Sequence, residues 1–262
     1  MTEASQPCLL IKVDSNGVKT LTLNRPEAFN ALSEELLAEL KKALDATALE
    51  KAVRVVILDA CGKAFCAGHD LKQMRAAPSL NYYQNLFERC TEVMLTLQGL
   101  SVPVIAKVHG LATAAGCQLV AMCDLAVASS SARFAVSGVN MGLFCSTPSV
   151  ALSRNVGRKA AFEMLITGAF ISAEEARQQG LVNRVAEPEM LDAAVDELVQ
   201  SILAKPQVAV AMGKQLFYGQ LEMGIADAYS NASQTMARNM MEYVALEGVQ
   251  AFIDKRTPDW SK

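Results

Sequence analysis

The chain has 262 residues, a formal net charge of −3 at pH 7, 52% hydrophobic residues and 19% charged residues. A net negative charge argues against nucleic acid as a partner, because the neutralisation of phosphates requires basic patches. The length fits one large domain, or one domain with a small appendage, and the apolar share allows a large core with some surface buried between subunits.

Seven cysteines and two histidines bear on metal binding and on the redox compartment. No CxxC pair occurs and most cysteines lie in apolar runs, so we expect reduced, buried thiols, no zinc site and no disulfide framework. The first seven residues do not resemble a signal peptide, and no apolar run is long enough to span a bilayer. We therefore expect no membrane association. The expected location is a bacterial cytoplasm, or the mitochondrial matrix if a transit peptide has been removed.

Strand and helix patterns alternate in the first half of the chain. Strands are expected at 8–14 and 18–24, joined by a turn at Gly17, and Ser33 is expected to cap a helix with leucines at helical spacing. The other expected elements are strands at 53–59, 104–108, 124–129 and 133–137, a polar loop at 74–81, and helices at 82–98 and through 118–122. This alternation predicts an α/β fold with a buried sheet.

From Thr147 onward the hydrophobic period becomes helical. Helices are expected at 148–155, 159–167, 173–179, 189–204, 207–218, 225–241 and near 244–255, separated by glycine and proline. This part is rich in Met and Leu and is not expected to bury itself alone. We therefore divide the chain into a core of residues 1–200 and a helical region of residues 201–262 that packs on a neighbour or on another subunit.

Two stretches of small residues, 65–71 and 110–116, each follow a β-branched apolar run and lead toward a helical pattern. Small side chains let a ligand oxygen approach the backbone, and the first turn of a helix leaves N–H groups without partners. Two such turns facing one point would form a two-donor oxyanion hole. We therefore interpret the chain as an enzyme that polarises a carbonyl group, with no obvious pair of carboxylates near these turns to move protons.

The order of the motifs along the chain resembles the crotonase, or enoyl-CoA hydratase/isomerase, superfamily. The motifs are Asn24-Arg25-Pro26 with Asn30-Ala31-Leu32, Ala64 to Lys72, Ala106 to Gly110 with Ala115 to Gln118, Met122 to Ala128, Thr167-Gly168, Ala173 to Ala176 with Gly180-Leu181-Val182, and Ala251-Phe252 with Lys255-Arg256. The resemblance covers nearly the whole chain. It implies a crotonase-like spiral of ββα turns followed by a C-terminal helical trimerisation region, assembled as a homotrimer or a dimer of trimers.

The resemblance also implies an acyl-coenzyme A thioester as substrate, with no separate cofactor. By motif position, the backbone N–H groups of His69 and Ala115 would hold the thioester oxygen. The residues implied to bind the CoA moiety or line the acyl site are Ala28, Ala67, Gly68, Asp70, Leu71, Lys72, Gly116, Cys145, Phe252 and Lys255. Phe252 and Lys255 would close the CoA site from the same subunit or from a neighbouring one.

Two positions depart from the family pattern. Hydratases of this superfamily use two glutamates to activate water and to protonate the α-carbon, and their motif positions are held here by Gln118 and Gly138. Gln118 is neutral and serves only as a hydrogen-bond donor and acceptor, and Gly138 has no side chain. General acid–base catalysis is worth about 10²–10⁴-fold per group, so both usual contributions are missing. We expect Gln118→Glu alone to raise hydration only slightly, because position 138 still has no side chain, and the double change with Gly138→Glu is the better test of rescue.

Three functions therefore stay open. The first is a weak or specialised enoyl-CoA hydratase or isomerase of fatty acid metabolism, in which Gln118 orients water or substrate. The second is an acyl-CoA decarboxylase, in which loss of CO₂ generates the enolate without a base. The third is a non-catalytic acyl-CoA binder or trimeric scaffold. The His69 side chain is either a catalytic acid or a spectator, and Cys145 is either a nucleophile or a thiol in the pocket wall. Asp70 and Asp124 are expected to be capping and scaffold carboxylates.

Overall fold

A six-stranded sheet is the main layer of the protein, whose computed structural model describes residues 6–76 and 78–260. The strand order is β1-β2-β3-β5-β7-β10, with β1 antiparallel to β2 and all other neighbours parallel. The strands are β1 (Leu9–Val13), β2 (Val18–Leu23), β3 (Val55–Ala60), β5 (Val104–Val108), β7 (Leu125–Ser129) and β10 (Arg184–Ala186). The predicted α/β class is confirmed.

A second, four-stranded sheet runs in the order β4-β6-β8-β9. Its strands are β4 (Ala64–Cys66), β6 (Leu111–Thr113), β8 (Arg133–Ala135) and β9 (Ile171–Ser172). β4, β6 and β8 are parallel, and β9 is antiparallel to β8. The strands β4 and β6 were not predicted, because three residues are too few to show an alternating pattern. The strands β9 and β10 were not predicted either, and they lie in the part expected to be helical.

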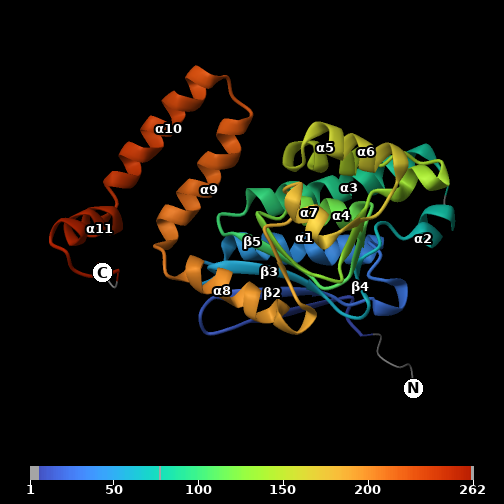
Figure 1. Cartoon of the computed structure of the whole chain (residues 1–262), viewed down its shortest axis with the longest axis horizontal. Coiled ribbons are helices and arrows are strands. Elements are labelled where there is room, and N and C mark those ends of the chain that lie inside the picture. Colours follow the sequence, from blue (N-terminus) through green and yellow to red (C-terminus); the bar gives the residue numbers. More distant parts are fainter. Residues whose placement is uncertain (1–5, 77, 261–262) are drawn as a thin grey trace.

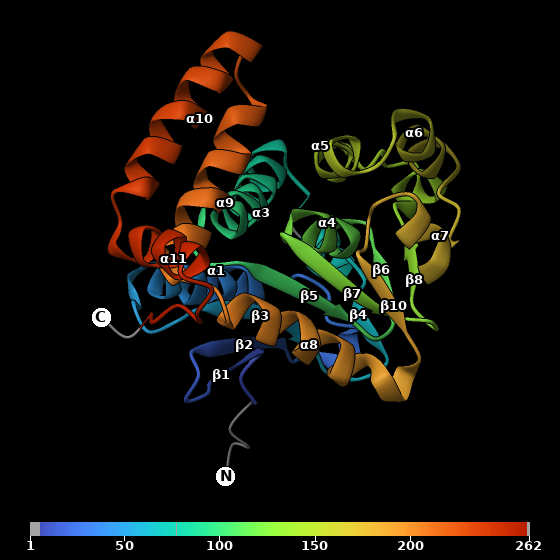
Figure 2. The same cartoon turned by 60° about the vertical axis from the view of Figure 1, so that its left-hand side comes forward.

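Helices cover both faces of the six-stranded sheet (Figures 1 and 2). The helices before the C-terminal part of the chain are α1 (Glu34–Leu49), α2 (Leu71–Ala76), α3 (Leu80–Gly99), α4 (Ala115–Met122), α5 (Ser146–Asn155), α6 (Arg158–Thr167), α7 (Ala173–Gln178) and α8 (Leu191–Leu203), with 3₁₀ turns η1 (Pro26–Ala28), η2 (Ser137–Met141) and η3 (Pro188–Met190). The polar loop predicted at 74–81 is wrong at both ends, because α2 runs to Ala76 and α3 already begins at Leu80.

The sheet separates two apolar clusters. The larger cluster lies under α1, α3 and α4, and α1 contributes four buried leucines, including Leu36 and Leu40. Ser33 begins this helix as predicted, because its hydroxyl accepts a hydrogen bond from Leu36 N at 3.2 Å. On the opposite face, α8 packs its Val195 and Val199 against the sheet. The candidate turns described below belong to the α4 side.

The last three helices form an arm that extends away from the sheets (Figures 1 and 2). They are α9 (Gln207–Leu221), α10 (Ile225–Met240) and α11 (Tyr243–Ile253). Large apolar side chains are exposed along the arm: Phe217, Leu221, Met223, Ile225, Tyr229, Met236, Met240, Met241, Tyr243, Leu246, Val249, Phe252 and Ile253. An apolar surface of this extent is typical of an interaction site. The division into two domains at residue 200 stays a prediction.

A buried lysine anchors the arm to the core. Lys214 is the one residue of α9 that is buried, and its ammonium donates to Leu97 O at 3.1 Å and to Val102 O at 3.0 Å. It also forms an ion pair with Asp124 at 2.6 Å, in which both side chains are almost fully buried. Asp124 further accepts from Val104 N at 2.6 Å, so it is a scaffold carboxylate as expected.

No helix in the described part of the chain is long and apolar enough to cross a bilayer.

We predict that Lys214→Met lowers the free energy of unfolding by about 3–5 kcal/mol, because it leaves the buried Asp124 carboxylate without its cation. Urea unfolding followed by circular dichroism measures this loss. Lys205→Met is the matched control, since Lys205 is an exposed lysine at the start of the same arm, and its effect should stay within about 0.5 kcal/mol. Similar losses in the two variants would contradict an anchoring role for Lys214.

Candidate active site

Two short parallel strands bring the two small-residue turns together. β4 and β6 pair through Cys66 and Ala112, and each strand leads directly into its turn. Thr113 Oγ1 donates to Ala67 O at 3.0 Å across the gap. A Cβ on Gly116 would collide with the Cys66 carbonyl oxygen, so only glycine allows α4 to start this close to β4.

Gly68 marks the point of closest approach between the turns. Its backbone has a φ of 95°, which favours glycine, and a Cβ there would lie 2.9 Å from Ala114 Cβ and 3.3 Å from Ala115 N. The turn that contains His69 therefore lies in direct contact with the first residues of α4. That the N–H groups of the two turns face one point stays a prediction.

The start of α4 presents backbone N–H groups without partners. Ala114 precedes the helix with a φ of 50° and a ψ of −120°, a conformation that is costly for a residue with a Cβ. Ala114 N donates to Ala135 O at 2.9 Å, whereas the N–H groups of Ala115 and Gly116 donate no hydrogen bond among the described residues. Free N–H groups in the first turn of a helix favour an electronegative ligand atom.

The N–H of His69 is also free among the described residues. His69 forms a parallel bridge with Leu32, in which Leu32 N donates to Gly68 O at 2.7 Å and Asp70 N donates to Leu32 O at 3.2 Å. In such a bridge the groups of the central residue point to the opposite side of the strand. The His69 N–H is thus directed away from Leu32 and takes part in no other backbone bond.

The His69 imidazole is buried and neutral. Its two ring nitrogens are inaccessible to solvent and have no hydrogen-bond partner in the described part of the chain, and the ring meets Phe87 edge-on with centroids 5.4 Å apart. Burial lowers the pKa of His69 to about 4. At neutral pH the ring offers one donor and one acceptor, and it is a poor source of a proton for general acid catalysis.

Gln118 lies one turn into α4 from Ala115, and it is 4% exposed. Its Oε1 atom is buried and accepts no hydrogen bond from the residues that the structure describes. The carboxamide nevertheless has no proton to give or take at ordinary pH. This position therefore brings hydrogen-bonding capacity to the turns but no acid or base.

Cys145 and Leu143 fill the space beside Gly138. A Cβ on Gly138 would collide with Leu143 O and would lie 2.8 Å from Cys145 Sγ, and Leu143 N donates to Gly138 O at 3.0 Å. Gly138→Glu is therefore a poor test of rescue on steric grounds, because any side chain at position 138 requires the backbone near Leu143 to move. Burial raises the pKa of the Cys145 thiol, which favours its role as a wall over one as a nucleophile.

The residues expected to bind CoA near the first turn lie close together. Asp70 accepts from Lys72 N at 3.1 Å and from Gln73 N at 3.3 Å, so it caps α2 as expected. Arg25 pairs with Asp70 at 3.0 Å and also donates to Ala31 O at 2.6 Å. This pair joins α2 to the loop that follows η1, which ends at Ala28. Ala28, Ala67, Gly68, Asp70, Leu71 and Lys72 thus form one continuous region.

Phe252 and Lys255 lie elsewhere in the chain. Phe252 is 85% exposed at the end of α11, which lies at the opposite end of the molecule from α2 (Figure 1). The structure therefore does not bring Phe252 and Lys255 to the other CoA-binding candidates within one chain. With α11 in this position, Phe252 and Lys255 of one chain do not close the CoA site of that same chain.

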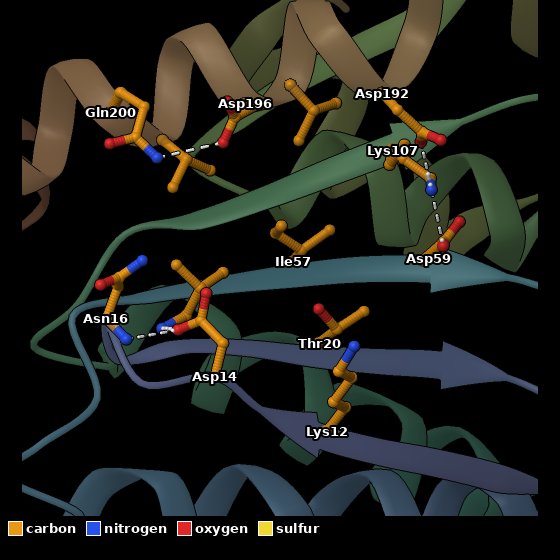
Figure 3. Close-up of a pocket in the computed structure, with 13 residues that line it drawn as sticks. Lys12, Asp14, Asn16, Thr20, Ile57, Asp59, Lys107, Asp192, Asp196 and Gln200 are labelled. Carbon is orange, nitrogen blue, oxygen red and sulfur yellow. Dashed lines mark hydrogen bonds and ion pairs between the residues drawn. The ribbon is translucent and has the colours of Figure 1, made fainter.

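A hollow of about 290 Å³ lies on the α8 side of the sheet, away from the two turns (Figure 3). Within it, Lys107 forms ion pairs with Asp59 at 2.9 Å and with Asp192 at 2.7 Å. It contains none of the predicted site residues. Among the described residues, no group of three or more His, Cys, Asp or Glu side chains is arranged to hold a metal ion.

A comparison with known families agrees with this geometry. Residues 14–262 match the model of a family described as enoyl-CoA hydratase/isomerase. The chain belongs to the enoyl-CoA hydratase/isomerase family. This confirms the crotonase superfamily assignment made from the motif order.

Relatives and solved structures extend this result. The chain is 44% identical over 257 residues to the mitochondrial enoyl-CoA hydratase domain-containing protein 3 of Rattus norvegicus, covering 98% of this chain and 86% of the rat protein. A crystal structure of an enoyl-CoA hydratase of Mycobacterium smegmatis is 64% identical, with a TM-score of 0.97 over 98% of this chain and 100% of that chain. The human enoyl Coenzyme A hydratase domain-containing protein 3 is 41% identical, with a TM-score of 0.93 over 97% of this chain and 100% of that chain. The fold is therefore that of the crotonase family.

Two features of the site were missed by sequence reasoning. Thr113 Oγ1 links the turns, and its place one residue before the Ala-Ala-Gly start of α4 was a usable signal. The filling of the space at Gly138 by Cys145 has no local signal, because it depends on the path of the loop between η2 and α5.

We predict that Gly138→Ala lowers the free energy of unfolding by about 1–3 kcal/mol, because the new methyl group meets the Leu143 carbonyl and the Cys145 sulfur. Denaturant unfolding measures this change. The control is Gly99→Ala at the end of α3, where nothing lies within 4 Å of a built Cβ. That variant should be neutral or up to about 1 kcal/mol more stable. A stable Gly138→Ala protein would show that position 138 has room for a side chain.

A second prediction concerns the pH dependence of stability. The pKa of His69 lies at about 4 in the folded chain and at 6.5 without burial, so only the unfolded chain takes up a proton between these values. Titration of His69 therefore leaves the free energy of unfolding unchanged above pH 6.5 and lowers it progressively as the pH falls to about 4. The full loss is up to about 3 kcal/mol.

The free energy of unfolding of wild type and of His69→Gln is measured in urea at about pH 7 and about pH 4. Carboxyl groups titrate in both proteins, so the contribution of His69 is the difference between the two proteins in the stability lost on this drop in pH. The wild type should lose more stability than the variant. An equal loss of stability in the two proteins would mean that the imidazole of the folded chain takes up a proton as readily as a free one.

Proposed function

We propose that the protein binds acyl-CoA thioesters and stabilises the thioester enolate between the backbone N–H groups of His69 and Ala115. The observation that carries this proposal is that neither amide donates to another described residue, and that their turns are held in contact by the β4–β6 pair. An enolate places negative charge on the thioester oxygen, and fixed donors there act at no reorganisation cost. Loss of one such donor typically costs about 3–4 kcal/mol of transition-state stabilisation.

The chemistry we propose is of the enoyl-CoA hydratase/isomerase type, without the usual pair of glutamates. Gln118 is close in sequence and on the same helix as the Ala115 amide, and its unpartnered Oε1 can orient water or the acyl group. Neither Gln118 nor Gly138 supplies an acid or a base. Addition of water to an enoyl group is therefore slow in this proposal, while enolate stabilisation is retained.

A second candidate, acyl-CoA decarboxylation, is favoured by the state of His69. The neutral imidazole has no protein partner for either nitrogen among the described residues, and departure of CO₂ forms the enolate with no base. Binding of acyl-CoA without turnover is the remaining alternative.

The proposal includes assembly of several copies, as a homotrimer or a dimer of trimers. The arm exposes an apolar surface that its own chain leaves uncovered, and Phe252 and Lys255 lie far from the turns of their own chain. In a neighbouring copy these two side chains would complete the CoA site. The rat relative is named as mitochondrial, and we propose either the mitochondrial matrix or a bacterial cytoplasm as the location.

The proposed function is tested with purified protein and two substrates. Crotonyl-CoA reports hydration through loss of enoyl absorbance, and malonyl-CoA reports decarboxylation through release of acetyl-CoA. We expect tight binding of both esters, with slow hydration. Faster turnover of malonyl-CoA would select the decarboxylase, and binding without turnover of either would select the non-catalytic alternative. Failure to bind any acyl-CoA would contradict the proposal.

We predict that Gln118→Glu raises the rate of crotonyl-CoA hydration by less than about tenfold, because one carboxylate cannot act as both base and acid here. The measurement is kcat/KM, with crotonyl-CoA affinity determined in parallel to show that the site is intact. A gain of about a hundredfold or more would mean that a second proton-transfer group is present and was overlooked.

A further inference from the structure

The chain after α11 folds back onto that helix. Arg256 N donates to Ala251 O at 3.0 Å and Lys255 N donates to Phe252 O at 3.2 Å, which ends the helix with Lys255 in the left-handed region at a φ of 54°. A residue other than glycine in this region is held there by its surroundings.

The Glu247 carboxylate binds the residues that follow α11. The Glu247 side chain is only 12% exposed, and it accepts two bonds from the Arg256 guanidinium, at 2.6 Å from Nη1 and 3.0 Å from Nη2. It also accepts from Asp259 N at 2.8 Å. Two-point bonding between a guanidinium and a carboxylate fixes direction as well as distance.

An aromatic ring completes the contact. A Cβ on Gly248 would lie 2.8 Å from Trp260 Cη2, so the indole rests against the helix backbone where a larger residue would displace it. We call Glu247, Gly248, Arg256, Asp259 and Trp260 the C-terminal clasp. The clasp holds both ends of the segment that contains Lys255.

The clasp presents an aromatic ring and an ammonium at one end of the arm. Phe252 is 85% exposed and Lys255 is exposed, and the Lys255 ammonium forms no ion pair among the described residues. Their chemistry matches a ligand that combines a flat base with phosphates, because a phenyl ring stacks on a purine and an ammonium binds phosphate oxygens. The nucleotide end of CoA has this composition.

We propose that the C-terminal clasp is a positioning device, which fixes Phe252 and Lys255 in the orientation that binds the nucleotide end of CoA held in a neighbouring copy. This inference rests on the proposed function, since it requires that acyl-CoA binds at the two turns. Without the clasp, the last residues would be free to move and would have to be ordered on each binding event. The clasp residues themselves do not touch the ligand.

The test is a double-mutant cycle in ligand affinity, measured by titration calorimetry with the assembled full-length protein. The variants are Glu247→Gln, Lys255→Met and the two together, and the ligands are crotonyl-CoA and crotonyl-pantetheine, which lacks the nucleotide. Asp227→Asn is the matched control, because it removes one exposed carboxylate from the same arm outside the clasp. Light scattering confirms that all variants keep the same assembly.

We expect Glu247→Gln to weaken crotonyl-CoA binding by about tenfold, because an unfixed Lys255 loses most of its charge-assisted contact. In the Lys255→Met background the same change should have little further effect. Crotonyl-pantetheine should bind all variants equally, and Asp227→Asn should behave as wild type.

The possible failures are distinguishable. If wild type binds neither ester, the proposed function fails and the clasp proposal falls with it. If wild type binds crotonyl-CoA and Glu247→Gln binds it equally well, only the clasp proposal is overturned. Equal weakening for both esters, additive losses in the double variant, or loss of assembly would each contradict positioning, because they indicate general structural damage.

Discussion

The close approach of α4 to β4 is the constraint on which the site depends. Gly116 packs on the Cys66 carbonyl so tightly that no side chain fits between them, and Thr113 bonds the Ala67 carbonyl across the same gap. Both contacts require β4 and β6 to end side by side as parallel strands. Given that pairing, the free amides of His69 and Ala115 emerge from adjacent turns, and the strained Ala114 directs the second of them. Hydrogen-bond donors placed in this way act through the backbone, so the neighbouring side chains are free to differ.

Three positions expected to carry the chemistry bring no charged group to these amides. Burial keeps the His69 imidazole uncharged, Gln118 has no ionisable group, and Gly138 is enclosed by Leu143 and Cys145. Position 138 therefore accepts no carboxylate by a single substitution, because the loop from η2 to α5 occupies the space that a side chain would need. Such surroundings suit reactions in which the substrate itself supplies the electron pair for the enolate. They do not suit reactions that need water to be activated.

The parts of the fold that follow local patterns were predictable from the sequence. The helix after Ser33 and the strand near Val55 carry strong periodic signals, and the structure contains both. The strands β4 and β6 were missed because three residues carry no period, although their turns were identified from the small residues that follow. The buried Lys214 was not foreseen, because a lysine in an amphipathic helix ordinarily faces solvent and only the tertiary contact with Asp124 overrides this. The candidate residues near the turns were within reach of motif reasoning, whereas the remote position of Phe252 required the path of the whole arm.

The most direct test of the central claim is a crystal structure of the protein with a non-reactive acyl-CoA analogue that retains a carbonyl oxygen. We expect this oxygen to lie about 2.7–3.1 Å from both His69 N and Ala115 N. An analogue that binds with its carbonyl oxygen outside hydrogen-bond reach of either amide would contradict the account.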